Sequence, residues 1–164
     1  MPLLYPMHCP KNDIQWPIPG GRKPNALLAT PETASLSIPN GNYVLVKRFS
    51  SKEQPRRIMA SLYEAAWFPE ADSFGLGLEN HLNYFHQRGA GLEQNLARGL
   101  AIYLSATCVD TYFRRFSGHT QVNATDLRNL RYPTCRQLTE LGARLKKDWP
   151  DPQTIDLWVS EVSA

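Results

Sequence analysis

The residues with the most evident chemistry form a short polar segment, and that chemistry is hydrogen bonding. Residues 118–123 read Gly-His-Thr-Gln-Val-Asn and follow two adjacent arginines, Arg114 and Arg115. An amide such as that of Gln121 donates and accepts side by side, which suits an adenine edge, whereas guanidinium groups suit guanine edges and phosphates. This composition favours contact with nucleic-acid bases. The alternative, equally open from the sequence, is that Gln121 and Asn123 only tie the loop to the turn that follows, through bonds to its backbone.

Further cations and amides extend this candidate interface. Arg22, Lys23 and Asn25 stand in a loop rich in proline and glycine, where we expect little structural need for them. Asn80, His81 and Asn83, in a predicted strand, join the set. A buried polar network would explain these three residues equally well. The whole candidate set for contact with nucleic acid is Arg22, Lys23, Asn25, Lys47, Arg48, Asn80, His81, Asn83, Arg114, Arg115, His119, Thr120, Gln121, Asn123 and Arg128.

The composition is that of an ordinary globular chain of 164 residues, 42% hydrophobic and 20% charged. Three widely spaced cysteines argue against a disulfide framework and favour a reducing, cytoplasmic location. No apolar run reaches the roughly 18 residues that a membrane span needs. The net charge is +3, and the charges segregate into basic stretches over 11–57 and 114–136 and an acidic stretch over 64–93. Such segregation builds one basic face, or it reflects solvated surfaces only.

The hydrophobic pattern predicts an α+β fold with an N-terminal extended arm, a small and mainly antiparallel sheet, and C-terminal helices that include one long helix. Residues 1–41 are rich in proline and glycine, which disfavour packed elements. Strands are expected over 43–49, where β-branched and aromatic residues gather, and over 76–85. Residues 56–63 are compatible with a strand or a helix, and the alternation of Ile58, Ala60 and Leu62 favours a strand. The long helix is expected over 92–116, because leucines recur there at every fourth position.

Local start signals predict the shorter helices. Either Asn123 or Thr125 is expected to cap a short helical turn. Thr134 and Gln137 have the spacing of a capping box for the next helix. A last helix is expected from Pro152, since proline suits the first position of a helix.

A set of motifs resembles a known family. G-x-T-Q-x-N over 118–123 is followed by D-L-x-x-L-x-x-P over 126–133, and residues 20–26, 40–53 and 79–86 add further stretches. Together they resemble the C-terminal target-recognition (specificity) domain of gamma-class adenine-N6 DNA methyltransferases of type II restriction–modification systems, the TaqI-like specificity domain. The same arrangement of motifs is related to that of type I restriction specificity subunits.

This resemblance, which covers most of residues 16–145, implies a DNA reader. It implies sequence-specific recognition of double-stranded DNA that positions a catalytic domain, which methylates adenine N6 with S-adenosylmethionine. That catalytic domain is expected in the same polypeptide or as a separate chain, and no cofactor is expected in this chain. The implied organisation is an extended arm or loop region over 1–41, the target-recognition domain over 42–148, and a C-terminal helix over 149–164 packed on the same domain.

The catalytic motifs of such enzymes do not occur in this sequence. Residues 74–77, Phe-Gly-Leu-Gly, superficially resemble the glycine-rich loop that binds S-adenosylmethionine, but a strand turn is the better interpretation. No Asp/Asn-Pro-Pro-Tyr/Phe motif for gripping a flipped base is found. We therefore expect no methyl transfer from this chain alone. One further departure is Ser105-Ala106, which stands where members of the family often carry Asn-Ser.

Two other functions are compatible with the sequence. One is a protein-interaction module of a restriction–modification complex, without base readout of its own. The other is a free-standing hydrolase or nuclease, which would need clustered carboxylates or a metal site. His81 and His86 are five residues apart and His8 adjoins Cys9, so no spacing typical of metal ligands is found. We assign no catalytic residue and no metal ligand.

Overall fold

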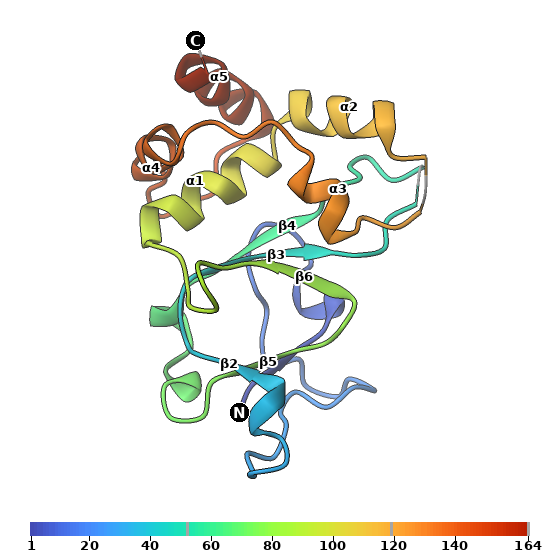
Figure 1. Cartoon of the computed structure of the whole chain (residues 1–164), viewed down its shortest axis with the longest axis vertical. Helices are drawn as coiled ribbons and strands as arrows, with labels where there is room; N and C mark the ends of the chain where they lie inside the picture. Colours follow the sequence, from blue (N-terminus) through green and yellow to red (C-terminus); the bar gives the residue numbers. More distant parts are fainter. Residues whose placement is uncertain (52, 119, 164) are drawn as a thin grey trace.

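The computed structural model describes residues 1–51, 53–118 and 120–163, and its mixture of helices and sheets confirms the α+β class. Helices cover one face of a central sheet, and a smaller sheet with the N-terminal segment lies beyond the other face (Figure 1). The strands are β1 (Leu3–Leu4), β2 (Ser37–Ile38), β3 (Tyr43–Lys47), β4 (Ala60–Tyr63), β5 (Leu76–Leu78) and β6 (Leu82–Phe85). The helices are α1 (Gln94–Leu104), α2 (Thr107–Phe116), α3 (Ala124–Arg128), α4 (Cys135–Ala143) and α5 (Pro152–Ser163), with 3-10 turns at Pro6–His8, Ala34–Leu36, Ala65–Trp67 and Pro69–Ala71.

Strand β3 is the centre of the molecule. It lies between β4 and β6 and is antiparallel to both. Its side chains alternate between two hydrophobic cores, because successive residues of a strand point to opposite faces. Val44 and Val46 belong to the core beneath the helices, whereas Tyr43 and Leu45 belong to the core on the side of the smaller sheet. All four are fully buried, so this strand must be apolar on both faces.

The helical layer is closed by an unusually near approach of α1 and α4. A Cβ atom on Gly99 of α1 would lie 1.8 Å from the carbonyl oxygen of Leu138. A Cβ atom on Gly142 of α4 would lie 1.8 Å from the carbonyl oxygen of Asn95. The two backbones are therefore in direct contact, and neither position has room for any side chain other than hydrogen.

The expected single helix over 92–116 is wrong, because the structure has two helices there with a break at Ser105-Ala106. The Ser105 hydroxyl donates to the carbonyl of Ala101 at 2.9 Å, and Ala106 is extended. Helix α2 then starts anew with the amide of Thr107 donating to the Asp156 carboxylate of α5 at 2.7 Å. This cap comes from a residue far along the chain, so the local leucine pattern could not reveal it.

The N-terminal segment is mostly irregular, as its prolines predict, but its first part is packed and is not a free arm. Leu4, His8 and Cys9 are buried in the core on the side of the smaller sheet. Burial raises the pKa of the Cys9 thiol to about 12, and Lys47 opposes this rise. Residues 19–24 form one exposed stretch of the segment, and Leu28 and Leu36 farther along are exposed as well.

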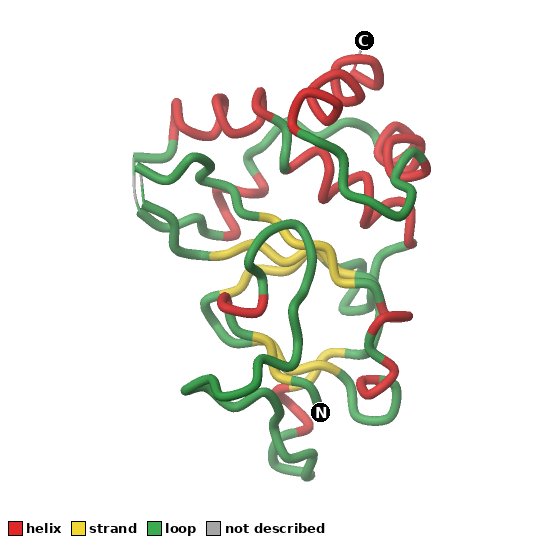
Figure 2. Tube along the Cα trace, turned by 180° about the vertical axis from the view of Figure 1, so that it is seen from behind, coloured by secondary structure: helices red, strands yellow, loops and turns green. Residues whose placement is uncertain are grey.

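The expected strand over 76–85 is also wrong as a single element. Residues Leu76–Leu78 pair with β1 and β2 in the smaller sheet, whereas Leu82–Phe85 pair with β3 in the central sheet. A turn at 79–81, in which the amide of Leu82 donates to the carbonyl of Glu79, carries the chain from one sheet to the other (Figure 2).

The helix start signals are confirmed. Asn123 caps α3, and its side chain accepts from the amide of Asp126 at 2.9 Å. Thr134 and Gln137 form the expected capping box of α4, and α5 begins at Pro152. Among residues 1–51, 53–118 and 120–163, no helix has the length and apolar composition to cross a membrane.

Replacing Gly99 by alanine is expected to lower the free energy of unfolding by at least about 2 kcal/mol, because the added methyl group overlaps the backbone of α4. The direction is opposite to the usual gain from alanine inside a helix. Urea denaturation measures the change. Gly118→Ala is the matched control, since a Cβ there meets no described atom within 4 Å, and it should change stability by at most about 1 kcal/mol. Equal stability of the two variants would show that the helices separate easily.

Candidate nucleic-acid interface

Three loops meet at one end of the central sheet, where β3 ends and β4 and β6 begin. They are the β3–β4 loop (48–59), the β5–β6 turn (79–81) and the α2–α3 loop (117–123), together called the loop cluster below. Phe49 and Gln121 form an antiparallel bridge, and the amide of Val122 donates to the carbonyl of Arg48 at 2.7 Å. The amide of Arg48 donates to the carbonyl of His81 at 2.9 Å. Both views show the first and third loops running side by side at this end (Figures 1 and 2).

Several predicted site residues brace the loop cluster from within. The Asn83 amide donates to the carbonyl of Val122 at 2.7 Å, and Asn123 caps α3. The Arg48 guanidinium donates to the carbonyl of Asn80 at 2.9 Å. Asn83 and Asn123 therefore bond within the protein, which is the alternative to base contact that the sequence left open. Their contact with nucleic acid stays a prediction.

Other predicted residues point outward from the same loops. Asn80, Thr120 and Gln121 are exposed, and within the described part of the chain their side chains make no hydrogen bond to protein. Arg128, at the end of α3, is likewise exposed. His119 lies outside the described residues. The loop cluster thus presents amide and hydroxyl groups to solvent from a backbone that is held in place.

Asp110 joins the β3–β4 loop to α2. One carboxylate oxygen accepts from the amide of Arg57 at 2.6 Å and from that of Ile58 at 3.4 Å. The other oxygen accepts from Nε of Arg114 at 2.6 Å. Arg57 is itself 1% exposed; its Nε donates to Ser50, and its guanidinium lies 5.6 Å from the ring of Phe113. This buried arrangement fixes the loop, and sequence reasoning missed both Asp110 and Arg57.

The geometry gives Arg114 a structural role. Its Nε pairs with Asp110, and Nη2 donates to the carbonyl of Gln54 at 2.7 Å. Arg115 instead faces an open hollow of about 550 Å³ between α2 and α5, lined also by Tyr112, Val159 and Asp156. Arg114 therefore holds the β3–β4 loop, whereas Arg115 faces the hollow. Their adjacent positions in the sequence did not indicate this difference.

One aromatic side chain interrupts the polar surface of the loop cluster. Phe49 is 46% exposed, and its ring centroid lies 5.1 Å from that of His81. The His81 imidazole is held in turn by Glu79, with Nδ1 2.7 Å from a carboxylate oxygen. Phe49 was not singled out from the sequence, because an aromatic residue at the end of a predicted strand indicates a position in the hydrophobic core.

The predicted residues of the N-terminal segment lie elsewhere, beyond the smaller sheet (Figure 1). The side chain of Asn25 has a structural role, contrary to expectation. Its amide group bonds to the backbone N–H and C=O of Ile18, both at 2.9 Å, and to the His8 ring at 3.0 Å. The Lys23 ammonium lies over the ring of Tyr5 at 5.4 Å. Arg22 is exposed. Lys47, at the end of β3, lies near Cys9 on the side of the smaller sheet.

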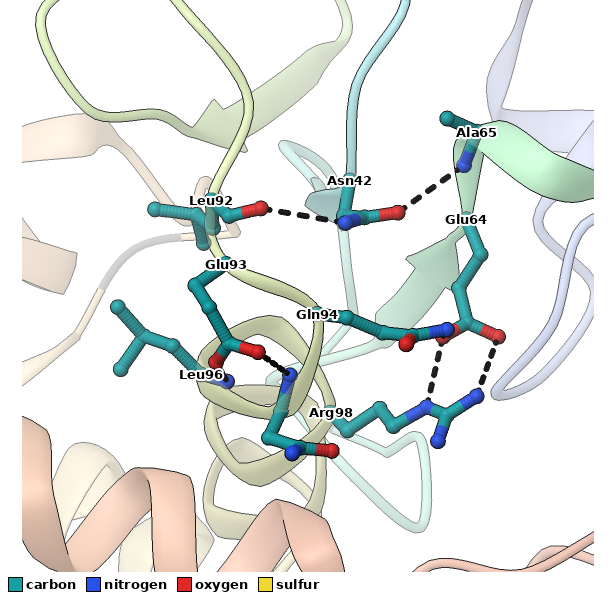
Figure 3. A network of polar contacts seen from close by, with 9 residues as sticks. Asn42, Glu64, Ala65, Leu92, Glu93, Gln94, Leu96 and Arg98 are labelled. Atoms are coloured by element: carbon teal, nitrogen blue, oxygen red, sulfur yellow. Dashed lines mark hydrogen bonds and ion pairs between the residues drawn. The ribbon is translucent and has the colours of Figure 1, made fainter.

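A separate polar network holds the opposite end of the central sheet (Figure 3). Glu64, which is 1% exposed, accepts from Arg98 through both carboxylate oxygens, at 2.7 and 3.2 Å, and from Gln94 at 3.0 Å. Nearby, the Asn42 amide donates to the carbonyl of Leu92. Both carboxylate oxygens of Glu64 accept from side chains of α1, so this buried carboxylate anchors the helix to the end of β4.

The Phe-Gly-Leu-Gly segment forms a turn and part of a strand of the smaller sheet, as the sequence predicts. Gly75 has φ +74°, and a Cβ there would lie 2.5 Å from the carbonyl oxygen of Ile38. Gly77 pairs with Leu3 and Ser37 inside the smaller sheet. The positive φ and the close backbone of Ile38 explain why a glycine stands at position 75. Within the described part of the chain, no group of three His, Cys, Asp or Glu side chains is placed to hold a metal ion.

The chain is similar to two bacterial methyltransferases. It is 48% identical over 143 residues to the type II methyltransferase M.PstI of Providencia stuartii, and 44% identical over 143 residues to the type II methyltransferase M.BsuBI of Bacillus subtilis. Each match covers 87% of the chain but only 27% and 28% of the relatives, so the chain spans little more than a quarter of their length. No protein-family profile and no solved structure matches it.

Replacing Asp110 by alanine is expected to lower the free energy of unfolding by about 2–4 kcal/mol, because it leaves the buried amides of Arg57 and Ile58 without an acceptor. Denaturation curves measure the loss, and backbone NMR shifts should change in the β3–β4 loop. Arg136→Ala is the control: it breaks the exposed Arg136–Glu140 pair and should cost no more than about 0.5 kcal/mol. A similar small loss for Asp110→Ala would mean that the loop holds its position without this carboxylate.

Proposed function

We propose that this chain is a target-recognition region of a type II DNA methyltransferase, and that it reads double-stranded DNA with the loop cluster. In this proposal a catalytic domain, in the same polypeptide or a separate chain, methylates adenine N6 with S-adenosylmethionine. The two relatives support a methyltransferase context. The adenine specificity is supported by the motif resemblance over residues 118–133.

The observation that carries the proposal is the exposed, unpaired state of Gln121, Thr120 and Asn80 on a braced backbone. Base edges in the major groove are read by amides, hydroxyls and guanidinium groups that have hydrogen-bonding capacity to spare. Holding the backbone in place before binding reduces the entropy lost on association. A set of polar side chains without partners, presented from three loops held by backbone bonds, fits this task better than it fits a purely structural one.

Phosphate contacts are assigned to cations that are free to make them. Arg128 is exposed at the end of α3, next to the loop cluster. Lys47 is half-buried on the side of the smaller sheet and is given no phosphate contact. Such contacts position the duplex and release counterions without reading sequence. Arg48 and Arg114 hold the loops through bonds to backbone carbonyls, so they support the reading residues from behind.

Gln121→Ala is expected to weaken binding to a duplex selected from a random pool by about 1–3 kcal/mol, with little change on unrelated DNA. Arg128→Ala should weaken binding to every duplex similarly and lower the slope of log affinity against log salt by about one unit. Fluorescence anisotropy at several salt concentrations measures both. Gln153→Ala, an exposed glutamine of α5 distant from the loop cluster in sequence and fold, is the control and should leave affinity unchanged. Equal losses for Gln121→Ala on selected and unrelated duplexes would reject base reading by this residue.

A protein-interaction module is the second candidate function, and the hollow between α2 and α5 favours it. Tyr112, Phe116 and Leu157 are 38%, 41% and 56% exposed on these two helices. Of these three side chains, Tyr112 lines the hollow itself, together with Val159. Exposed apolar side chains on neighbouring helices are typical of contact with another polypeptide. The duplex titration separates the two functions: failure to bind any duplex, even at low salt, would leave protein contact as the function of the chain.

A further inference from the structure

The exposed ring of Phe49 has a defined neighbour. Single exposed aromatic residues are common and carry no meaning by themselves. Phe49 differs because it forms an antiparallel bridge with Gln121, the amide proposed above to read a base. Residues directly opposite each other in an antiparallel pair project to the same face, with Cβ atoms roughly 5 Å apart. An apolar ring and an unpaired amide therefore stand side by side.

The backbone on both sides of Phe49 is fixed. The carbonyl of Arg48 accepts from Val122 at 2.7 Å, and the amide of Ser50 donates to Thr120 at 3.0 Å. The Cβ atoms of Phe49 and Gln121 cannot separate without breaking this pairing. The two side chains therefore behave as one surface, apolar at one side and hydrogen-bonding at the other.

One side of the ring is already occupied. The His81 imidazole lies 5.1 Å away at an interplanar angle of 55°, and Glu79 holds that imidazole. Insertion between stacked base pairs needs a ring with both faces free. The geometry thus disfavours a wedge and favours contact of the exposed part of the ring with a group at a base edge.

An A·T base pair offers the complementary surface in the major groove. Adenine presents an acceptor and a donor that a glutamine amide binds together, and thymine presents its C5 methyl group beside them. We propose that Phe49 contacts the C5 methyl group of a thymine, at or next to the A·T pair that Gln121 reads, and so contributes to sequence specificity. This inference rests on the proposed function of the loop cluster.

The test replaces each thymine of the selected duplex by deoxyuridine, one position at a time, which removes the methyl group and keeps base pairing. For the unaltered chain, one replacement should lower affinity about fourfold, the factor for one buried methyl group. In Phe49→Ala the thymine and uracil duplexes should bind equally well. Phe49→Leu keeps an apolar side chain and should retain part of the preference. Phe74→Ala, which removes an exposed aromatic ring outside the loop cluster, should retain all of it.

Three results would overturn the inference. One is a selected site in which no thymine-to-uracil replacement changes affinity. Another is a Phe49→Ala chain that binds more weakly but keeps the full thymine preference, because the ring would then act only through the fold. In both cases Gln121→Ala can still lower the affinity for the selected duplex more than the affinity for unrelated DNA, so the proposed function survives. The third is a chain that binds no duplex, which removes the proposed function together with the inference. Thermal unfolding of each variant confirms that the comparison is made between folded chains.

Discussion

The direct backbone contact between α1 and α4 is the constraint on which the arrangement of the molecule depends. Because Gly99 and Gly142 bring these helices together without side chains between them, α4 lies across α1 and α5 packs against both. α5 in turn supplies Asp156, the carboxylate at which α2 begins. α2 then carries Asp110, which holds the β3–β4 loop. A contact on the far side of the helical layer thereby determines where the loop cluster stands.

Much of the fold could be predicted from the sequence where the signals are local. The strands at 43–47 and 60–63 follow from β-branched and apolar residues, and the caps at Asn123 and Thr134 follow from short spacings. The break at Ser105-Ala106 could not be predicted, because the carboxylate that caps the new helix at Thr107 lies 49 residues farther along the chain. The sequence also did not predict that residues 76–85 are divided between two sheets, because tertiary packing decides which strands pair.

In the candidate site, too, local features could be predicted from the sequence and features that depend on tertiary contacts could not. Gln121 and Thr120 could be found from residue type, since a polar loop after a helix has few structural reasons to hold an amide. Asn25 and Asn83 look alike in sequence, yet the side chain of Asn25 bonds to the backbone of Ile18 in its own loop and that of Asn83 bonds to the distant carbonyl of Val122. Phe49 was hidden because one apolar residue at the end of a strand cannot be distinguished from its buried neighbours by pattern alone.

The bonds that hold the loop cluster together have a consequence for how its surface changes over generations. Phe49, Thr120 and Gln121 are held in place through main-chain bonds, and main-chain bonds place no requirement on the side chains that project outward from them. The support comes from buried residues that do not reach the surface, Asp110 and Arg57 among them. Outward positions are thereby decoupled from stability, and a lineage can exchange these side chains one at a time while every intermediate still folds. A surface built this way is evolvable: its chemical preference drifts while its scaffold stays the same.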